Sequence, residues 1–339
     1  MKFNFDATGI GSVPFKDAKA ACDVIFDSFA TIPFWPQLPK SSFLENMYVQ
    51  FSESLPGMVI DEANKAIHVE AEGVAETIEE VYQNCLDGNT EFFRISETHA
   101  RGFYEFLERL KTPPKSAKFV KGHITGPISY ALTVTTETKK ALIHDKDLFE
   151  ILTKVLCMKA RWQIKKLKKL FPSVIIFIDE PYLVSIGSSF VNINIEEAFA
   201  KLDELIAAIK SEGALAGLHC CGNTDWSMLL KRDLDILNFD SYNYIKEFLL
   251  YGADIKAFLA KGATIAWGIV PSSDAVDKEN GKSIAEKLRG EFKMLADKGI
   301  PADNISSIIT PSCGLGSLDE DRARKILEVT RIASNNLQR

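Results

Sequence analysis

The chain has 339 residues, of which 46% are hydrophobic, and it can therefore bury the core of one large α/β domain. Its formal net charge of -6 argues against nucleic-acid binding, which needs a clustered excess of Lys and Arg. The N-terminus lacks the apolar region of a signal peptide, and no apolar run approaches the ~18 residues of a membrane span. We therefore expect a cytoplasmic protein with no membrane or nucleic-acid partner, whose cysteines stay reduced.

Short apolar runs rich in β-branched residues alternate with longer amphipathic stretches. In chain order, the predicted strands are residues 7–13, 32–38, 118–124, 174–178, 214–219, 235–239, 264–269 and 306–309. This alternation is typical of a parallel sheet, and eight βα units favour a closed (β/α)8 TIM barrel. We expect a single TIM-barrel catalytic domain over residues 1–339.

A TIM barrel needs only ~250 residues, so the extra length predicts an insertion. The best place for it is residues 48–114, after the second predicted strand. Within this range, the strand-like runs 58–60 and 66–70 flank a polar turn, which predicts an inserted hairpin followed by helical segments.

Residues that suggest chemistry fall repeatedly at the ends of the predicted strands. They are Ser12, Gly126, Asp179, Glu180, His219, Cys221, Asp240 and Cys313. In a βα barrel, all of these ends open on one face, where the active site lies. The sequence therefore predicts that these residues converge on one site.

His219 and Cys221 form a His-x-Cys pair at the end of an apolar run, and Cys313 follows a similar run far downstream. Side chains alternate along a strand, so His219 and Cys221 point the same way, and a distant strand must supply further ligands. Imidazole and thiolate are the preferred ligands of zinc. The same spacing also suits a buried core histidine with two inert cysteines.

Five motifs in order resemble the catalytic C-terminal half of cobalamin-independent methionine synthase. That family shares a barrel superfamily with uroporphyrinogen decarboxylase and the methylcobamide methyltransferases. The motifs are IGS at residues 10–12, KGHITGP at 121–127, IDEP at 178–181, HCC at 219–221 and CGL at 313–315. The chain is thus similar to a short, core form of this family.

The resemblance implies a zinc ion and a homocysteine substrate. The implied zinc ligands are His219, Cys221, Cys313 and Asp240, the last at a position where the family carries glutamate. Zinc deprotonates a bound thiol and so prepares it for attack on a methyl group. The implied partner of the homocysteine ammonium is Asp179, with Glu45 as a second candidate, and the loop of Ile10, Gly11 and Ser12 would hold the carboxylate.

Three departures from the family concern the methyl donor. We expect no counterpart here of the family's N-terminal barrel, which helps to bind folate, and residues 267–272 lack the histidine that protonates the departing folate nitrogen. The tryptophan that packs on the pterin falls near Thr133. A methyl group on a corrinoid cobalt leaves Co(I) behind and needs no general acid. We therefore expect a methylcorrinoid donor, either methylcobalamin or a corrinoid on a carrier protein.

Two alternatives stay open from the residues alone. A methylcobamide:thiol methyltransferase for another thiol, such as coenzyme M, would keep the zinc site but needs no acidic ammonium pocket. A non-catalytic zinc-binding or corrinoid-binding module would close the fourth coordination position with a protein ligand such as Cys220.

Overall fold

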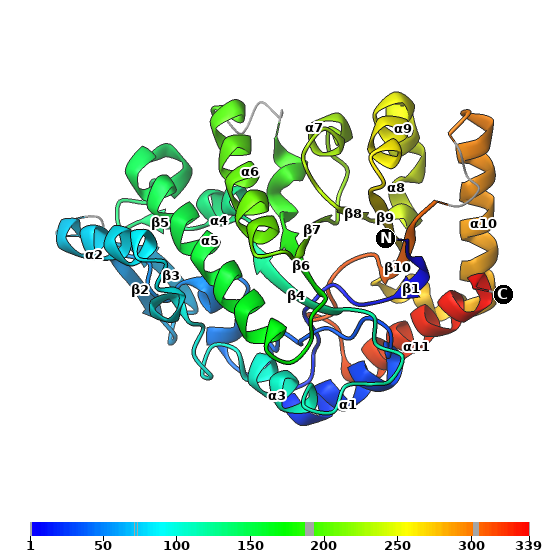
Figure 1. Ribbon diagram of the computed structural model, residues 1–339, viewed down its shortest axis with the longest axis horizontal. Helices are drawn as coiled ribbons and strands as arrows, with labels where there is room; N and C mark the ends of the chain where they lie inside the picture. Colours follow the sequence, from blue (N-terminus) through cyan, green and yellow to red (C-terminus); the bar gives the residue numbers. More distant parts are fainter. Residues whose placement is uncertain (1, 71, 73, 187–192, 301–304, 339) are drawn as a thin grey trace.

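A computed structural model describes residues 2–70, 72, 74–186, 193–300 and 305–338. Its centre is a curled parallel sheet of seven strands in the order β1-β10-β9-β8-β7-β6-β4, with helices around the outside (Figure 1). The strands are β1 (Asn4–Ala7), β4 (Val120–Thr125), β6 (Val174–Asp179), β7 (Leu215–Cys220), β8 (Ile236–Phe239), β9 (Thr264–Val270) and β10 (Ser307–Pro311). Six of these strands lie where the sequence predicts them.

The helices follow the strands in the alternation that the sequence predicts. They are α1 (Ala18–Ser28), α3 (Arg101–Arg109), α4 (Pro127–Thr133), α5 (Lys146–Lys168), α6 (Ile195–Ser211), α7 (Trp226–Leu230), α8 (Ser241–Phe248), α9 (Gly252–Ala260), α10 (Gly281–Asp297) and α11 (Glu320–Leu337). Both faces of the sheet are covered, and this explains why its strands read as nearly continuous apolar runs.

The inside of the curled sheet has its own apolar cluster, separate from the larger one under the helices. In β6, Ile175 and Phe177 belong to the inner cluster, whereas Ile176 and Ile178 belong to the outer one. This alternation is the period of two that a strand imposes. Asp179 continues the inner series at the end of β6 and therefore points toward the inside of the sheet.

The prediction of a strand at residues 32–38 is wrong. The segment forms only two isolated bridges, Phe34 with Lys121 of β4 and Ser12 with Gln37. Its prolines at positions 33 and 36 have no backbone N–H, so a continuous hydrogen-bond ladder cannot form. The segment nevertheless lies between β4 and the residues that follow β1, and it bonds to both.

The first predicted strand is also displaced, since β1 ends at Ala7 and residues 8–13 contribute only the bridge at Ser12. Two glycines let this segment run close to its neighbours. A Cβ atom would lie 2.3 Å from the Phe34 ring at Gly9 and 2.9 Å from His123 Nδ1 at Gly11. Within the described residues, the central parallel sheet thus has seven strands in place of the predicted eight.

The hairpin predicted within the insertion is confirmed. Strands β2 (Met58–Asp61) and β3 (Ala66–Val69) pair antiparallel, and the short β5 (Thr135–Thr136) joins β3 to complete a second sheet. Helix α2 (Ala75–Leu86) follows the hairpin and packs on α5.

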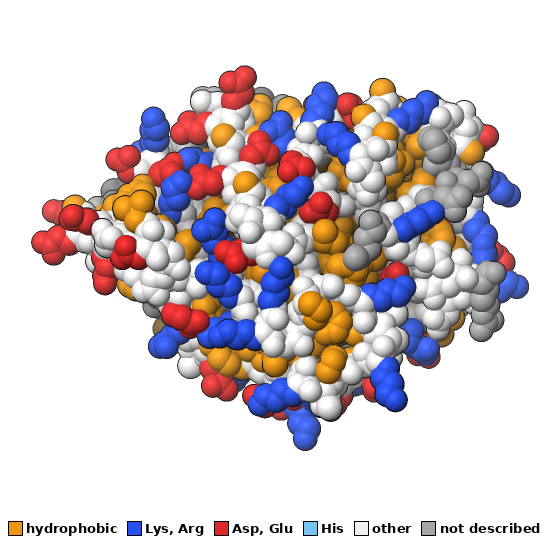
Figure 2. All heavy atoms as spheres, in the orientation of Figure 1, with side chains coloured by type: hydrophobic (Ala, Val, Ile, Leu, Met, Phe, Trp, Pro, Cys, Tyr) orange, Lys and Arg blue, Asp and Glu red, His pale blue; other side chains and the backbone are white. Residues whose placement is uncertain are grey.

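On the face shown in Figure 2, Lys and Arg side chains are interspersed with Asp and Glu. None of the helices described combines the length and the apolar composition needed to cross a bilayer.

Candidate metal centre and substrate pocket

His219, Cys221 and Cys313 meet in space. His219 lies in β7, Cys221 directly follows that strand, and Cys313 follows β10. Their potential ligand atoms all lie within 4.8 Å of one another. One imidazole and two thiols form a donor set that suits zinc, and three protein ligands leave a coordination position for a substrate.

Asn238 of β8 orients the imidazole of His219. The two residues face each other across the β7–β8 pair, and His219 Nδ1 contacts Asn238 Oδ1. The Asn238 Nδ2 group donates to Ala266 O and Thr310 Oγ1, both at 2.8 Å, so its Oδ1 must be the acceptor. His219 Nδ1 therefore carries a proton, and Nε2 is the nitrogen that faces Cys221 and can bind a metal once its own proton is lost.

The two cysteines of the cluster share a proton. A hydrogen bond from the Cys313 thiol, together with one from His219, lowers the pKa of Cys221 to about 4, and the same contact raises the pKa of Cys313. Ser272 holds the second cysteine in place, because its Oγ accepts from Cys313 N at 3.0 Å and donates to Cys313 O at 3.0 Å. Cys221 thus carries the thiolate that a metal requires.

Asp240 and Cys220 stand apart from this cluster. The Asp240 carboxylate caps α8, with Oδ1 accepting from Asn243 N at 3.0 Å and Oδ2 from Asn243 Nδ2 at 2.7 Å. Cys220 is buried in the outer apolar cluster, where its thiol donates to Gly222 O. Within the part of the chain that the structure describes, only His219, Cys221 and Cys313 form a group of potential ligands. Asp240 as a fourth ligand stays a prediction.

The cluster opens into a pocket of about 360 Å³. The pocket brings together most of the residues that the sequence predicts for the site, and adds several from the loops after β10 and near residue 46. Its lining residues are Ile10, Ser12, Gln37, Pro39, Asn46, Met47, Asp179, Pro181, His219, Cys221, Cys313, Gly314, Gly316 and Ser317.

Asp179 supplies the pocket with a buried negative charge. It lies beside His219 in the β6–β7 pair, and its Oδ1 atom is buried with no hydrogen-bond partner among the described residues. Burial raises the pKa of Asp179 to about 6, against the opposing effects of His219 and Lys121. A partly buried carboxylate in a pocket wall, with no hydrogen-bond partner among the described residues, is suited to a cationic group of a ligand.

Lys121 of β4 lies beneath the pocket, and sequence reasoning missed it. Its side chain is fully buried, its ammonium donates to Ile10 O, and it lies 4.4 Å from the centre of the Phe177 ring. Burial lowers the pKa of Lys121 to about 7. Lys121 therefore fixes the backbone of the loop of Ile10, Gly11 and Ser12. Gly11 itself does not line the pocket. The signal was a lysine within a predicted strand, residues 118–124.

Glu45 does not line the pocket. It lies in the turn η1 (Phe43–Glu45), where its Oε2 accepts from Leu38 N at 3.0 Å. Its other oxygen is buried without a partner among the described residues, and burial raises the pKa of Glu45 to about 7. Glu45 braces the chain behind the pocket wall, and its role as an ammonium ligand stays a prediction.

Glu180 and Thr133 have local structural partners. The Glu180 carboxylate accepts from Ile128 N at 2.9 Å and Ser129 N at 2.7 Å at the start of α4, and Thr133 Oγ1 donates to Ser129 O in the same helix. The buried Glu180 therefore holds α4 against the end of β6.

Comparisons with known proteins show the fold. No family model and no curated protein matches the sequence. Among solved structures, the chain is similar to a B12-independent methionine synthase from Shewanella sp. W3-18-1 in complex with selenomethionine. The two share 15% identity and a TM-score of 0.59, over 98% of this chain and 97% of that one.

Two further matches are glycoside-processing proteins. The pneumococcal virulence factor StrH matches with 10% identity and a TM-score of 0.47, over 98% of this chain and 84% of that one. A β-glycosidase from Thermosphaera aggregans matches with 10% identity and a TM-score of 0.42, over all of both chains. At 15% identity, the likeness to the methionine synthase shows a shared fold alone, so activity must be argued from the site.

Proposed function

We propose that the protein is a zinc-dependent methyltransferase that transfers a methyl group from a methylcorrinoid to homocysteine and forms methionine. The observation that carries this proposal is the cluster of His219, Cys221 and Cys313 in the same pocket as the unpaired carboxylate of Asp179. A thiol-binding metal and an ammonium-binding acid in one pocket match the two ends of an amino-acid thiol.

Each end of homocysteine has a counterpart in the pocket. Bound zinc would supply the Lewis acidity that keeps the substrate thiol deprotonated. Asp179 accepts the substrate ammonium, and the loop from Ile10 to Ser12, fixed from below by Lys121, receives the carboxylate. The sulfur then attacks the methyl carbon, a C–S bond forms, and the C–Co bond breaks with its electron pair left on cobalt.

The donor assignment rests on the residues directly after β9. Family members that use folate place a proton-donating histidine there, whereas this chain has Pro271 and Ser272. The Ser272 hydroxyl is already hydrogen-bonded to the backbone of Cys313. Because Co(I) leaves without a proton, a methylcorrinoid needs no such donor. The fold shared with a B12-independent methionine synthase over nearly the whole chain supports methyl transfer to homocysteine and does not bear on the donor.

Two finer parts of the proposal concern the setting of the site. Residues 32–38 hydrogen-bond to β4 and to the segment after β1, so we infer that they complete the wall of a closed (β/α)8 barrel. Free thiols at the metal centre suit the reducing cytoplasm.

The test is a methionine assay with zinc-loaded protein, homocysteine, and either methylcobalamin or methyltetrahydrofolate. We expect methionine from methylcobalamin alone, loss of activity after zinc removal, and recovery when zinc is added back. Equal rates from the two donors would contradict the corrinoid assignment. Methylation of coenzyme M in preference to homocysteine would contradict the substrate.

A further inference from the structure

Gln37 lies in the pocket wall at one end of a buried chain of hydrogen bonds. Its Nε2 donates to Gln50 Oε1 at 2.7 Å, and Gln50 Nε2 donates to the backbone oxygen of His99 at 2.7 Å. Gln50 is fully buried in the turn η2 (Val49–Phe51), and only 6% of Gln37 is exposed. This series of hydrogen bonds thus links the insertion to the pocket.

The hydrogen bond to the His99 carbonyl determines the orientation of both side-chain amides, those of Gln50 and Gln37. The His99 carbonyl can only accept, so Gln50 must present its nitrogen to it and its oxygen to Gln37. Gln37 must then present its nitrogen to Gln50. Because Gln37 also lines the pocket, its Oε1 is the polar atom left for a ligand. No group in the described part of the chain donates to this oxygen.

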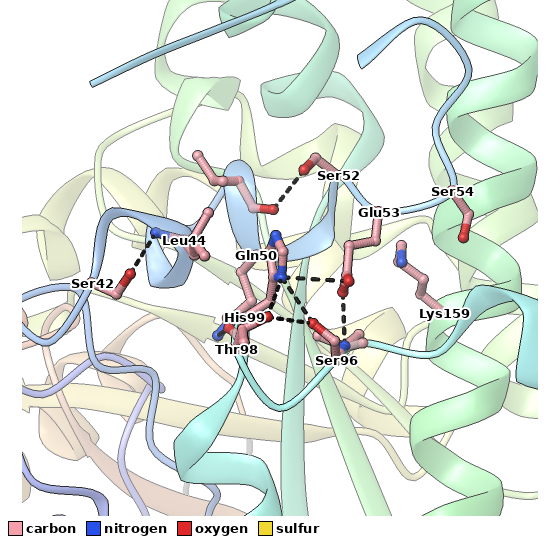
Figure 3. Close-up of polar contacts among 12 residues, drawn as sticks. Ser42, Leu44, Gln50, Ser52, Glu53, Ser54, Ser96, Thr98, His99 and Lys159 are labelled. Carbon is pink, nitrogen blue, oxygen red and sulfur yellow. Dashed lines mark hydrogen bonds and ion pairs between the residues drawn. The ribbon is translucent and has the colours of Figure 1, made fainter. Parts of the chain in front are cut away.

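The anchor at His99 is itself held by hydrogen bonds (Figure 3). His99 Nδ1 lies 2.9 Å from Ser96 Oγ and 3.4 Å from a Glu53 oxygen, and Ser96 N donates to Glu53 Oε2 at 2.7 Å. The buried Lys159 of α5 lies next to this group (Figure 3). Since the anchor is fixed, turning the Gln37 amide over would leave Gln50 Oε1 facing another oxygen.

We propose that Gln37 Oε1 is a second acceptor for the ammonium group of the substrate, and that Gln50 and His99 hold it in that orientation. An ammonium has three donors, and the Asp179 carboxylate, which lines the same pocket, supplies one acceptor. Gln37 supplies another, so the pocket selects thiols that carry an amino group. This inference rests on the proposed function, because it concerns the same substrate.

The test compares two ligands that differ only in the amino group. Titration calorimetry on zinc-loaded protein measures the Kd of homocysteine and that of 4-mercaptobutanoate. We expect Gln37→Leu to weaken homocysteine binding by roughly 10- to 100-fold, the range for a hydrogen bond to a charged group. Binding of 4-mercaptobutanoate should stay close to wild type. Gln50→Leu should give a smaller loss in the same direction, since it only releases the Gln37 amide.

Gln163→Leu is the matched control. Gln163 is also buried with both ends of its amide hydrogen-bonded, to Trp35 Nε1 and His123 O, but it does not line the pocket. Its loss should change stability and leave the ratio of the two Kd values unchanged. If Gln37→Leu does not hold zinc, Gln37→Met, with a side chain of nearly the same length, takes its place.

The outcomes separate this inference from the function on which it rests. Wild-type protein that binds both ligands equally would overturn both. Wild-type protein that prefers homocysteine, with a Gln37→Leu variant that keeps the full preference, would overturn only the role of Gln37.

Discussion

His219 and Asn238 face each other across neighbouring strands, and the asparagine fixes which nitrogen of the histidine carries its proton. Asn238 can do this because Ala266 O and Thr310 Oγ1 occupy its amide nitrogen. The result is a histidine whose Nε2 faces the cysteine thiols. The buried Asn238 of the central sheet thereby orients a ligand of the metal site.

We predict that Asn238→Leu weakens zinc binding by roughly 10- to 100-fold, the usual effect of removing the hydrogen-bond partner of a metal-binding histidine. Competition with a chelator measures the zinc affinity. Thr310→Val removes one contact of Asn238 and keeps the contact with His219, so it should bind zinc nearly as wild type does. Unchanged affinity in Asn238→Leu would show that the imidazole needs no such orientation.

The zinc ligands can be tested by metal content. We expect Cys221→Ser and Cys313→Ser to lose the metal, because thiolates supply much of the affinity for zinc. Cys220→Ala is the control, since Cys220 is buried in the outer apolar cluster and should not affect zinc content. Asp240→Asn tests the fourth ligand. Wild-type zinc content in that variant would show that Asp240 only caps α8 and does not bind zinc.

Asp179→Asn should weaken homocysteine binding by about 2–5 kcal/mol, the range for truncating one partner of a buried charge pair. Zinc content should stay at the wild-type level, because Asp179 is not a predicted ligand. Calorimetric titration with homocysteine provides the measurement. A variant with wild-type affinity would contradict the ammonium pocket and favour a thiol without an amino group, such as coenzyme M.

Stability should depend on pH through Glu291 of α10. Both of its carboxylate oxygens are buried without partners in the described chain, and burial raises its pKa from 4.5 to about 8. A carboxyl with a higher pKa in the folded state binds its proton more tightly there. The free energy of unfolding should therefore fall as the pH rises from about 4.5 to about 8.

Glu291→Gln removes this dependence because an amide does not ionise. We expect the variant to be more stable than wild type near pH ~9 and to keep only roughly half of this advantage near pH ~6. Each unit of pKa difference corresponds to about 1.4 kcal/mol, so the effect should reach a few kcal/mol. Urea unfolding at both pH values measures it, with the exposed Glu286→Gln on the same helix as control. The same difference at both pH values would contradict the assignment.

The parts of the site that follow strand periodicity could be predicted from sequence. His219 and Cys221 share a face because strands alternate, and Cys313 joins them because parallel strands end at one edge. Gln37 and Asn238 could not be found in this way. Their roles depend on which partners occupy the ends of each amide, and those partners come from distant segments such as residues 96–99.

The strand wrongly predicted at residues 32–38 shows a second limit of sequence patterns. Apolar composition predicts burial correctly for residues 32–38, but prolines within the run prevent a ladder. The carboxylate at position 240 could be located at a strand end, yet its use as a helix cap depends on Asn243, three residues later.

The central claim is that a substrate thiol binds the metal held by His219, Cys221 and Cys313. The most direct measurement is X-ray absorption at the zinc edge, on zinc-loaded protein with selenohomocysteine in place of homocysteine. We predict a zinc–selenium scattering shell that is absent without the ligand and absent in Cys221→Ser. A zinc spectrum that does not change when selenohomocysteine is bound would contradict the claim.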